Sequence, residues 1–208
     1  MKVLLINGSC NETGCTYTAL KIVAENLNRN DVETEIIQIG KSALRDCTGC
    51  KACRKNGGHC VFKDDIVNDV IDKAKDADGF VFGSPVYYAH PSGRLLSLMD
   101  RLFYAGSYAF AYKPAAAVVS ARRAGTTAAV DVITKYFTIN KMPVVSSNYW
   151  NMVHGNNPEE VLQDLEGLQI MRTLGDNMAW LIKCIKSAKD AGISYPKQEE
   201  KILTNFVR

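Results

Sequence analysis

The sequence lacks a long apolar run near its N-terminus. The first apolar stretch covers only residues 3–6 before a polar turn begins. A signal peptide needs a longer apolar core, and a membrane-spanning helix needs about 20 apolar residues. We therefore expect a cytoplasmic protein with no membrane partner.

An excess of charge of one sign is also missing. The chain has 25 basic and 22 acidic residues, for a net charge of +3, and they are spread along its length. Proteins that bind nucleic acid concentrate their cations on one face or stripe. We therefore expect no nucleic acid partner.

Short apolar runs alternate with amphipathic segments. Runs at residues 3–6, 36–39, 80–82, 115–119 and 142–145 predict five buried strands. Apolar residues repeat at intervals of three and four in five predicted helices: Leu20/Val23/Ala24/Leu27, Val67/Val70/Ile71/Ala74, Leu95/Leu98/Met99/Leu102, Ala129/Val132/Ile133/Tyr136 and Leu174/Met178/Leu181/Ile185. Parallel strands joined by right-handed helical crossovers place helices on both faces of a sheet. The prediction is an α/β fold, a flavodoxin-like doubly wound five-stranded parallel sheet in a three-layer α/β/α sandwich, within one domain over residues 1–208.

The first loop after a strand, residues 8–18, is rich in small and hydroxylic residues and leads into a helix. Ligands of doubly wound sheets bind beyond the carboxyl ends of the strands, and a helix N-terminus offers free amides and partial positive charge. Amides and the hydroxyls of Ser9, Thr13 and Thr16 therefore predict a phosphate site. A plain N-cap and tight turn is the structural alternative.

Three common phosphate motifs are absent from that loop. No Gly-Lys-Ser/Thr follows it, and only Gly8 and Gly14 fall within it, so it is neither a P-loop nor a dinucleotide fingerprint. Low-molecular-weight phosphatases need an arginine after five residues from the loop cysteine. Counting from Cys10 and Cys15 reaches Thr16 and Lys21 instead, which excludes a guanidinium clamp.

A second loop, residues 83–93, is aromatic and contains two prolines. Such a loop gives a flat ring a rigid apolar wall. Tyr87 and Tyr88 are equally consistent with ordinary packing.

These residues carry a family resemblance. Gly8-Ser9 with Thr16, Ser84-Pro85-Val86-Tyr87 and Met99-Asp100-Arg101 resemble the NADPH-dependent FMN reductase-like family of flavodoxin-fold proteins. The resemblance implies FMN as cofactor, NAD(P)H as co-substrate and a homodimer or homotetramer. It implies three sets of flavin-binding residues: Ser9, Asn11, Thr13, Cys15, Thr16 and Tyr17 at the phosphate; Pro85, Val86, Tyr87 and Tyr88 at the isoalloxazine; and Ser120, Arg122 and Gly125 in a third loop. The chain departs from the family at Cys10 and Asn11, where proline and arginine are common.

Four cysteines lie close together in an insert at residues 47–60: Cys47, Cys50, Cys53 and Cys60. Thiolates are the preferred ligands of iron-sulfur clusters and zinc. The spacing resembles the iron-sulfur flavoproteins, and this resemblance implies a 4Fe-4S cluster beside FMN. Zinc and free thiols remain the alternatives. Of the other cysteines, Cys10 and Cys15 are expected as space-filling residues or as redox thiols activated by the helix end, and Cys184 as a core residue.

Two further segments belong neither to the three predicted flavin loops nor to the cysteine insert. An aromatic stretch, residues 147–155, follows the predicted fifth strand and is expected at the flavin end of the sheet, where the resemblance implies that it reaches a neighbouring subunit. The tail, from about residue 194 to 208, is charged and is expected to pack on a partner subunit.

The function that the sequence predicts is an FMN-binding oxidoreductase. It passes electrons from a reduced nicotinamide or a protein donor through FMN to a small-molecule or protein acceptor. Because the flavin supplies the chemistry, no catalytic residue is assigned. The alternative is an iron-sulfur flavoprotein that acts as a non-enzymatic electron carrier.

Overall fold

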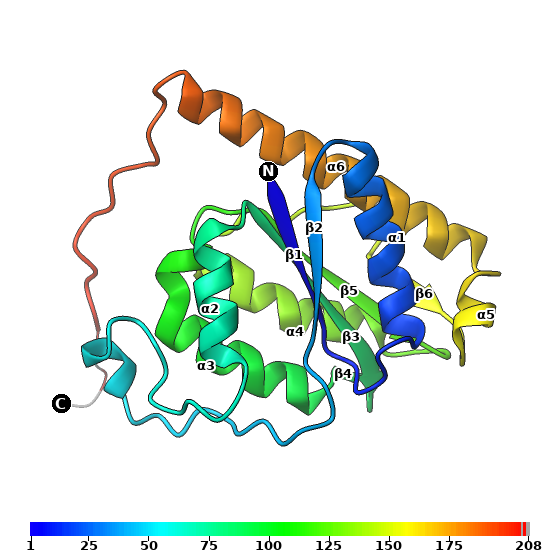
Figure 1. Cartoon of the computed structure of the whole chain (residues 1–208), viewed down its shortest axis with the longest axis horizontal. Helices are drawn as coiled ribbons and strands as arrows, with labels where there is room; N and C mark the ends of the chain where they lie inside the picture. Colours follow the sequence, from blue (N-terminus) through cyan, green and yellow to red (C-terminus); the bar gives the residue numbers. More distant parts are fainter. Residues whose placement is uncertain (205, 207–208) are drawn as a thin grey trace.

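The computed structural model describes residues 1–204 and 206 (Figure 1). Five parallel strands form the sheet in the order β2-β1-β3-β5-β6, which is the flavodoxin-like winding. Their bounds are β1 Lys2–Asn7, β2 Glu33–Gln38, β3 Gly79–Tyr87, β5 Ala115–Ala121 and β6 Met152–His154. A sixth strand of two residues, β4 (His90–Pro91), pairs antiparallel with the end of β3. The predicted fold class is therefore confirmed, with one short strand more than expected.

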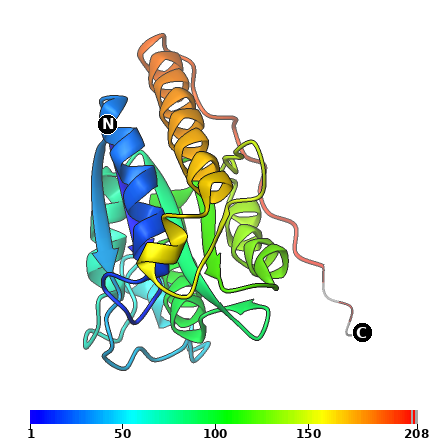
Figure 2. The same ribbon diagram turned by 90° about the vertical axis from the view of Figure 1, so that its right-hand side faces the viewer.

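The helices cover both faces of the sheet. Their bounds are α1 Cys15–Arg29, α2 Val67–Asp76, α3 Gly93–Phe110, α4 Thr126–Ile139, α5 Pro158–Val161 and α6 Leu165–Asp190, with a 3₁₀ helix η1 at Ala52–Lys55. Helices α1 and α6 lie side by side on one face (Figure 2), and α2, α3 and α4 pack on the other. This is the predicted three-layer sandwich.

Alternate residues of each buried strand face opposite helical layers. In β1, Leu4 and Ile6 join the core under α2, α3 and α4, while Val3 and Leu5 join the core under α1 and α6. The same alternation holds in β3 and β5, because successive side chains of a strand point to opposite faces. Apolar runs buried on both faces are typical of parallel sheets.

The predicted fifth strand was misplaced. Residues 142–145 form only one isolated bridge, between Val144 and Ala115. Pro143 has no N–H with which to extend a ladder, and the chain leaves the sheet before it pairs again as β6 beside Val119. The aromatic residues Tyr149 and Trp150 therefore lie in an excursion at the sheet edge, exposed and edge-on to each other at 4.8 Å between ring centroids. The expectation that residues 147–155 follow the last strand was wrong, because β6 lies within that stretch.

One expectation for the C-terminal part, a buried Cys184, is wrong, and that of a tail packed on a partner subunit stays a prediction. Cys184 is exposed, whereas Ile182 is buried, because residues two apart on a helix point to different sides. The tail leaves α6 as an extended segment (Figure 2), and Tyr195 stacks on Tyr112 of its own chain at 4.7 Å between centroids. Residues 205, 207 and 208 of the tail lie outside the described residues. None of the described helices is both long and apolar enough to cross a membrane.

Helix α4 allows a direct test of the assigned core. Phe137 is fully buried with its ring 5.4 Å from that of Phe82, whereas Ile139, two residues later, is 81% exposed. We expect Phe137→Ala to lower the free energy of unfolding by about 3–5 kcal/mol, because it removes apolar contacts and leaves a cavity. Ile139→Ala should stay within about 0.5 kcal/mol of the original chain. Urea unfolding followed by circular dichroism measures both, and equal losses would mean that this face of α4 is assigned wrongly.

Candidate functional site

The first loop is organised by Asn7, at the end of β1. The Ser9 amide donates to Asn7 Oδ1 at 3.1 Å, and Asn7 Nδ2 donates to the Asn11 carbonyl at 3.2 Å. Gln38, at the end of β2, donates to the Ser9 carbonyl at 2.8 Å. Side chains at the ends of two neighbouring strands thus fix the loop. Sequence reasoning missed Asn7 and Gln38, although both stand where parallel strands end.

The N-terminus of α1 is left open to an anion. Its N-cap residue, Gly14, has no side chain that could accept from the first amides, and the first turn of the helix carries no acidic residue. Thr13 and Cys15 line an open pocket there, together with Asn11 and residues of the loop before α5. Lys41 lies on the same pocket. Free amides and one lysine suit this place to a phosphate, with the Glu12 side chain as the one acidic group among its described lining residues.

Lys41 is a functional candidate that sequence reasoning missed. It follows β2, which lies beside β1 in the sheet. The carboxyl ends of parallel neighbours meet at one edge, so a loop residue shortly after β2 can supply the positive charge that the first loop lacks.

Thr16 and Ser120 face each other across the site. Their hydroxyl oxygens are 2.9 Å apart, and both residues are buried. This contact joins the first turn of α1 to the end of β5. Two residues predicted from different loops are therefore brought together, and their hydroxyls hold the scaffold beneath the loops.

The second loop is a tight hairpin between β3 and β4. Its two central residues, Tyr88 and Ala89, have φ values of 51° and 60°, as a two-residue type I′ turn requires. Side chains other than glycine seldom adopt this conformation. Tyr87 is 51% exposed and Tyr88 is fully exposed. Ordinary core packing is thus wrong for both tyrosines, and their faces are available to a ligand or partner.

The third loop packs directly on this hairpin. Gly125 has φ of 91°, and a Cβ built on it would lie 2.6 Å from the Ala89 Cα. Glycine is therefore required for the close approach of the two loops. Pro85 and Val86 are partly buried behind the hairpin, and Arg122 is exposed.

Cys15 differs from one of its expected roles, that of a redox thiol activated by the helix end. Burial raises the pKa of the Cys15 thiol, which opposes the activation expected from the helix end. The Cys15 sulfur lies 3.6 Å from the Gly155 carbonyl oxygen, just after β6. Cys15 is therefore a packing residue between two loops. Burial, with the Cys10 thiol nearby, raises the pKa of Tyr87, so the first two loops also meet at this tyrosine.

The four cysteines of the insert share one cavity. Cys47, Cys50, Cys53 and Cys60 all line a hollow of about 110 Å³ between residues 47–62 and helix α3. None of the four forms a disulfide within the described residues. In the part of the chain that the structure describes, no three metal-ligating side chains are arranged to hold a single ion. The predicted set thus lines one cavity without forming a single-ion site among the described residues.

Positive charge surrounds this cavity. Among its described lining residues are Lys51, Arg54 and Arg101, and none is acidic. The amide of Ala52 and the hydroxyl of Thr48 lower the pKa of the Cys50 thiol. These features favour negative charge between the cysteines.

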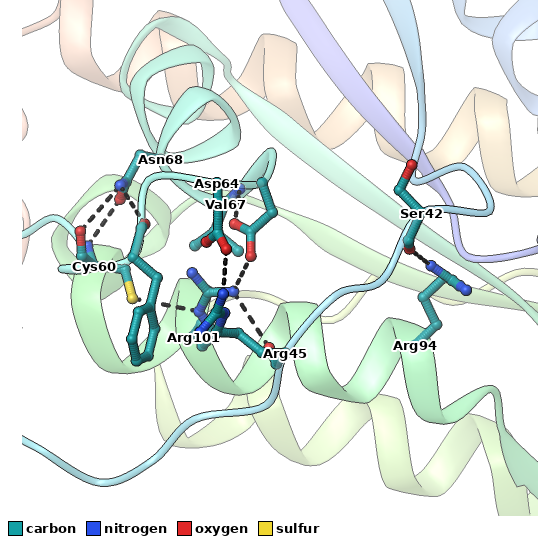
Figure 3. Close-up of polar contacts among 10 residues, drawn as sticks. Ser42, Arg45, Cys60, Asp64, Val67, Asn68, Arg94 and Arg101 are labelled. Atoms are coloured by element: carbon teal, nitrogen blue, oxygen red, sulfur yellow. Dashed lines mark hydrogen bonds and ion pairs between the residues drawn. The ribbon is translucent and has the colours of Figure 1, made fainter.

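Helix α3 connects the cavity to the loops at the sheet edge. It begins just after the hairpin, where the Ser92 hydroxyl donates to the Gly8 carbonyl at 2.8 Å and accepts from the Leu95 amide. Further along, Arg94 donates to the Ser42 carbonyl and Arg101 to the Arg45 carbonyl (Figure 3). The chain between the two sites is therefore fastened to one helix.

The winding of the sheet and the loops at its carboxyl edge define a flavodoxin-like protein. The chain matches the NADPH-dependent FMN reductase family over residues 1–157, and it belongs to that family. It is 33% identical over 194 residues to an iron-sulfur flavoprotein of Methanocaldococcus jannaschii, a match covering 89% of this chain and 100% of the relative. It is 26% identical over 195 residues to an iron-sulfur flavoprotein of Methanosarcina thermophila, covering 91% and 100% of the two chains.

Solved structures support the fold. A flavodoxin from the domain Archaea superposes with a TM-score of 0.59 at 16% identity, covering 88% of this chain and 99% of that chain. Family and fold together confirm the predicted class, an FMN-binding oxidoreductase with iron-sulfur flavoproteins among its relatives.

The Thr16–Ser120 contact yields a test that needs no ligand. Thr16→Val leaves the buried Ser120 hydroxyl without its partner, so we expect a loss of about 1–3 kcal/mol in the free energy of unfolding. Adding Ser120→Ala removes the stranded hydroxyl and should recover part of that loss. Urea unfolding of the two single variants and the double variant measures the coupling. Strictly additive losses would show that the hydroxyls do not interact.

Proposed function

We propose that this chain binds FMN at the carboxyl edge of its sheet and a 4Fe-4S cluster between its four cysteines, and that it carries electrons between the two. The observation that carries the proposal is the gathering of all four cysteines around one cavity, beside a helix that starts at the proposed flavin loops. The relatives named iron-sulfur flavoproteins support the same reading.

The phosphate of FMN fits the N-terminus of α1. Uncapped amides, Thr13 and Lys41 surround that pocket. The isoalloxazine fits beside the hairpin, where Pro85 and Val86 form a fixed wall and Tyr87 and Tyr88 are exposed. FMN supplies the redox chemistry when bound. The residues of this chain position it and shape its access to solvent.

The cysteine cavity fits an anionic cluster better than zinc. A four-iron cluster holds its four thiolates farther apart than one tetrahedral ion does, and these cysteines surround a shared space. The cationic lining favours the negative charge of such a cluster. Cys47, Cys50, Cys53 and Cys60 are its proposed ligands.

The second candidate function is an NAD(P)H-dependent FMN reductase that works without the cluster. Arg122 and Arg123 favour it, because both are exposed just after β5, where a nicotinamide phosphate could bind. In either case we propose a small-molecule or protein acceptor. We also propose a homodimer or homotetramer in which exposed aromatic residues, among them Tyr149 and Trp150, meet a neighbouring subunit's flavin site.

Lys41 tests the phosphate site. We expect Lys41→Met to weaken FMN binding roughly fivefold, as loss of an exposed ion pair of about 1 kcal/mol implies. Riboflavin, which has no phosphate, should bind both proteins equally. Quenching of flavin fluorescence gives the two affinities, and Lys21→Met, on the exposed side of α1, is the matched control. A protein that binds neither flavin would contradict the proposal itself.

Cys50 tests the cluster. Cys50 and Cys184 are both exposed, so replacing either with serine should leave the fold intact. Under anaerobic reconstitution we expect about four irons and four sulfides per original chain. Cys184→Ser should retain them, and Cys50→Ser should lose most of them.

The same pair of variants separates the two candidate functions. If the original chain takes up no iron or sulfide while Cys50→Ser oxidises NADPH or NADH at the original rate, the cluster is rejected and the reductase stands. The visible spectrum of the anaerobic protein, with flavin bands and broad absorbance beyond them, provides an independent measure.

A further inference from the structure

Arg101 stands out among the residues around the cysteine cavity. It is a charged side chain on α3 that is only 1% exposed. Its Nε donates to the Cys60 sulfur at 3.3 Å, and its Nη1 donates to the Arg45 carbonyl at 3.3 Å and pairs with the Asp65 carboxylate. Figure 3 shows the guanidinium beside Cys60. One nitrogen of this buried cation thus faces a proposed cluster ligand.

The remaining nitrogen, Nη2, has no hydrogen-bond partner in the part of the chain that the structure describes. Arg101 Nη2 is a buried donor that finds no acceptor among the described residues, although Arg101 lines the cysteine cavity. A buried donor without an acceptor is costly and rare in native proteins. An acceptor held in the cavity would satisfy it.

We propose that Arg101 compensates the charge of the cluster held by the four cysteines: Nε binds the Cys60 sulfur and Nη2 binds a second acceptor within the cavity. This inference rests on the proposed cluster. The cation stabilises the reduced cluster more than the oxidised one, because reduction adds one negative charge. Hydrogen bonds to sulfur and net local charge are main determinants of iron-sulfur reduction potentials.

A purely structural role does not account for this arrangement. Tying the insert to α3 requires only the contacts with Asp65 and the Arg45 carbonyl, which use one nitrogen of Arg101. The other two nitrogens are left for the sulfur and the cavity. Asp65, itself buried, sets how much of the positive charge is neutralised. Arg101 and Asp65 should therefore shift the reduction potential in opposite directions.

Arg45 provides a matched control. It also pairs with an aspartate, Asp64, and its guanidinium also lies over the Phe62 ring, 4.6 Å from the centroid against 5.4 Å for Arg101. Its side chain is 50% exposed, however, and among the described residues it donates to Asp64 and to no cysteine sulfur. Solvent screens the charge of an exposed cation strongly.

The experiment is a redox titration of the anaerobically reconstituted full chain, followed by electron paramagnetic resonance. We expect Arg101→Met to disfavour reduction at least tenfold, which is about 59 mV more negative for one electron. Arg101→Lys, which keeps the charge without the planar fork, should shift less in the same direction. Asp65→Asn should shift the potential positive, and Arg45→Met should change it less than threefold.

The outcomes separate this inference from the function on which it rests. An original chain that binds no iron rejects the cluster and this role of Arg101 together. An iron-loaded Arg101→Met protein with an unchanged potential rejects the role of Arg101 alone, as would equal shifts for Arg101→Met and Arg45→Met. If Arg101→Met does not fold, Arg101→Lys and Asp65→Asn replace it. Shifts of the reduction potential in opposite directions support the role of Arg101, and shifts in the same direction reject it. Thermal unfolding of the iron-free variants shows which of them fold.

Discussion

The backbone contact between Gly8 and Gly83 holds the site together. The Gly8 amide donates to the Gly83 carbonyl at 2.8 Å, so β1 and β3 stay paired beyond the end of β1. A Cβ on Gly8 would lie 2.5 Å from that oxygen, which leaves glycine as the residue that fits. The Gly8 carbonyl in turn accepts from Ser92 at the start of α3. The first loop, the hairpin and α3 therefore diverge from one fixed point.

Helix α3 runs from this fixed point to the cysteine cavity. Arg101 lies nine residues after Ser92, which is about 14 Å along a helix. A second connection runs beside it, because Lys41 lines the pocket at α1 and Cys47 lines the cysteine cavity six residues later. The two proposed cofactor sites are thus spaced by a rigid element, although the insert itself contains only one short 3₁₀ helix.

The sequence predicted the layers well and the site in part. Strands buried on both faces and helices with one apolar stripe have distinct periods, so β1, β3, β5 and the main helices could be assigned. The last strand, β6, could not be assigned. The apolar run around Pro143 resembles a strand more than the three residues of β6 do, so the prediction fell on that run. Spacing revealed the four cysteines as a set. The buried state of Arg101 remained hidden, because it depends on which helix the insert folds over, and no local pattern encodes that. Lys41 was missed although it lies in the loop that follows β2.

The buried guanidinium links ligand binding to the folding of the insert. An unsatisfied Nη2 costs roughly 1–3 kcal/mol, and the insert has few regular backbone hydrogen bonds of its own with which to offset this. A ligand that supplies the missing acceptor removes the cost only in the folded state. It therefore stabilises the insert through mass action as well as through its bonds to the cysteines. Removing the charge of Arg101 would leave the Asp65 carboxylate buried without its partner and would weaken the hold of the insert on an anionic cluster, so the empty and the loaded insert both depend on this residue.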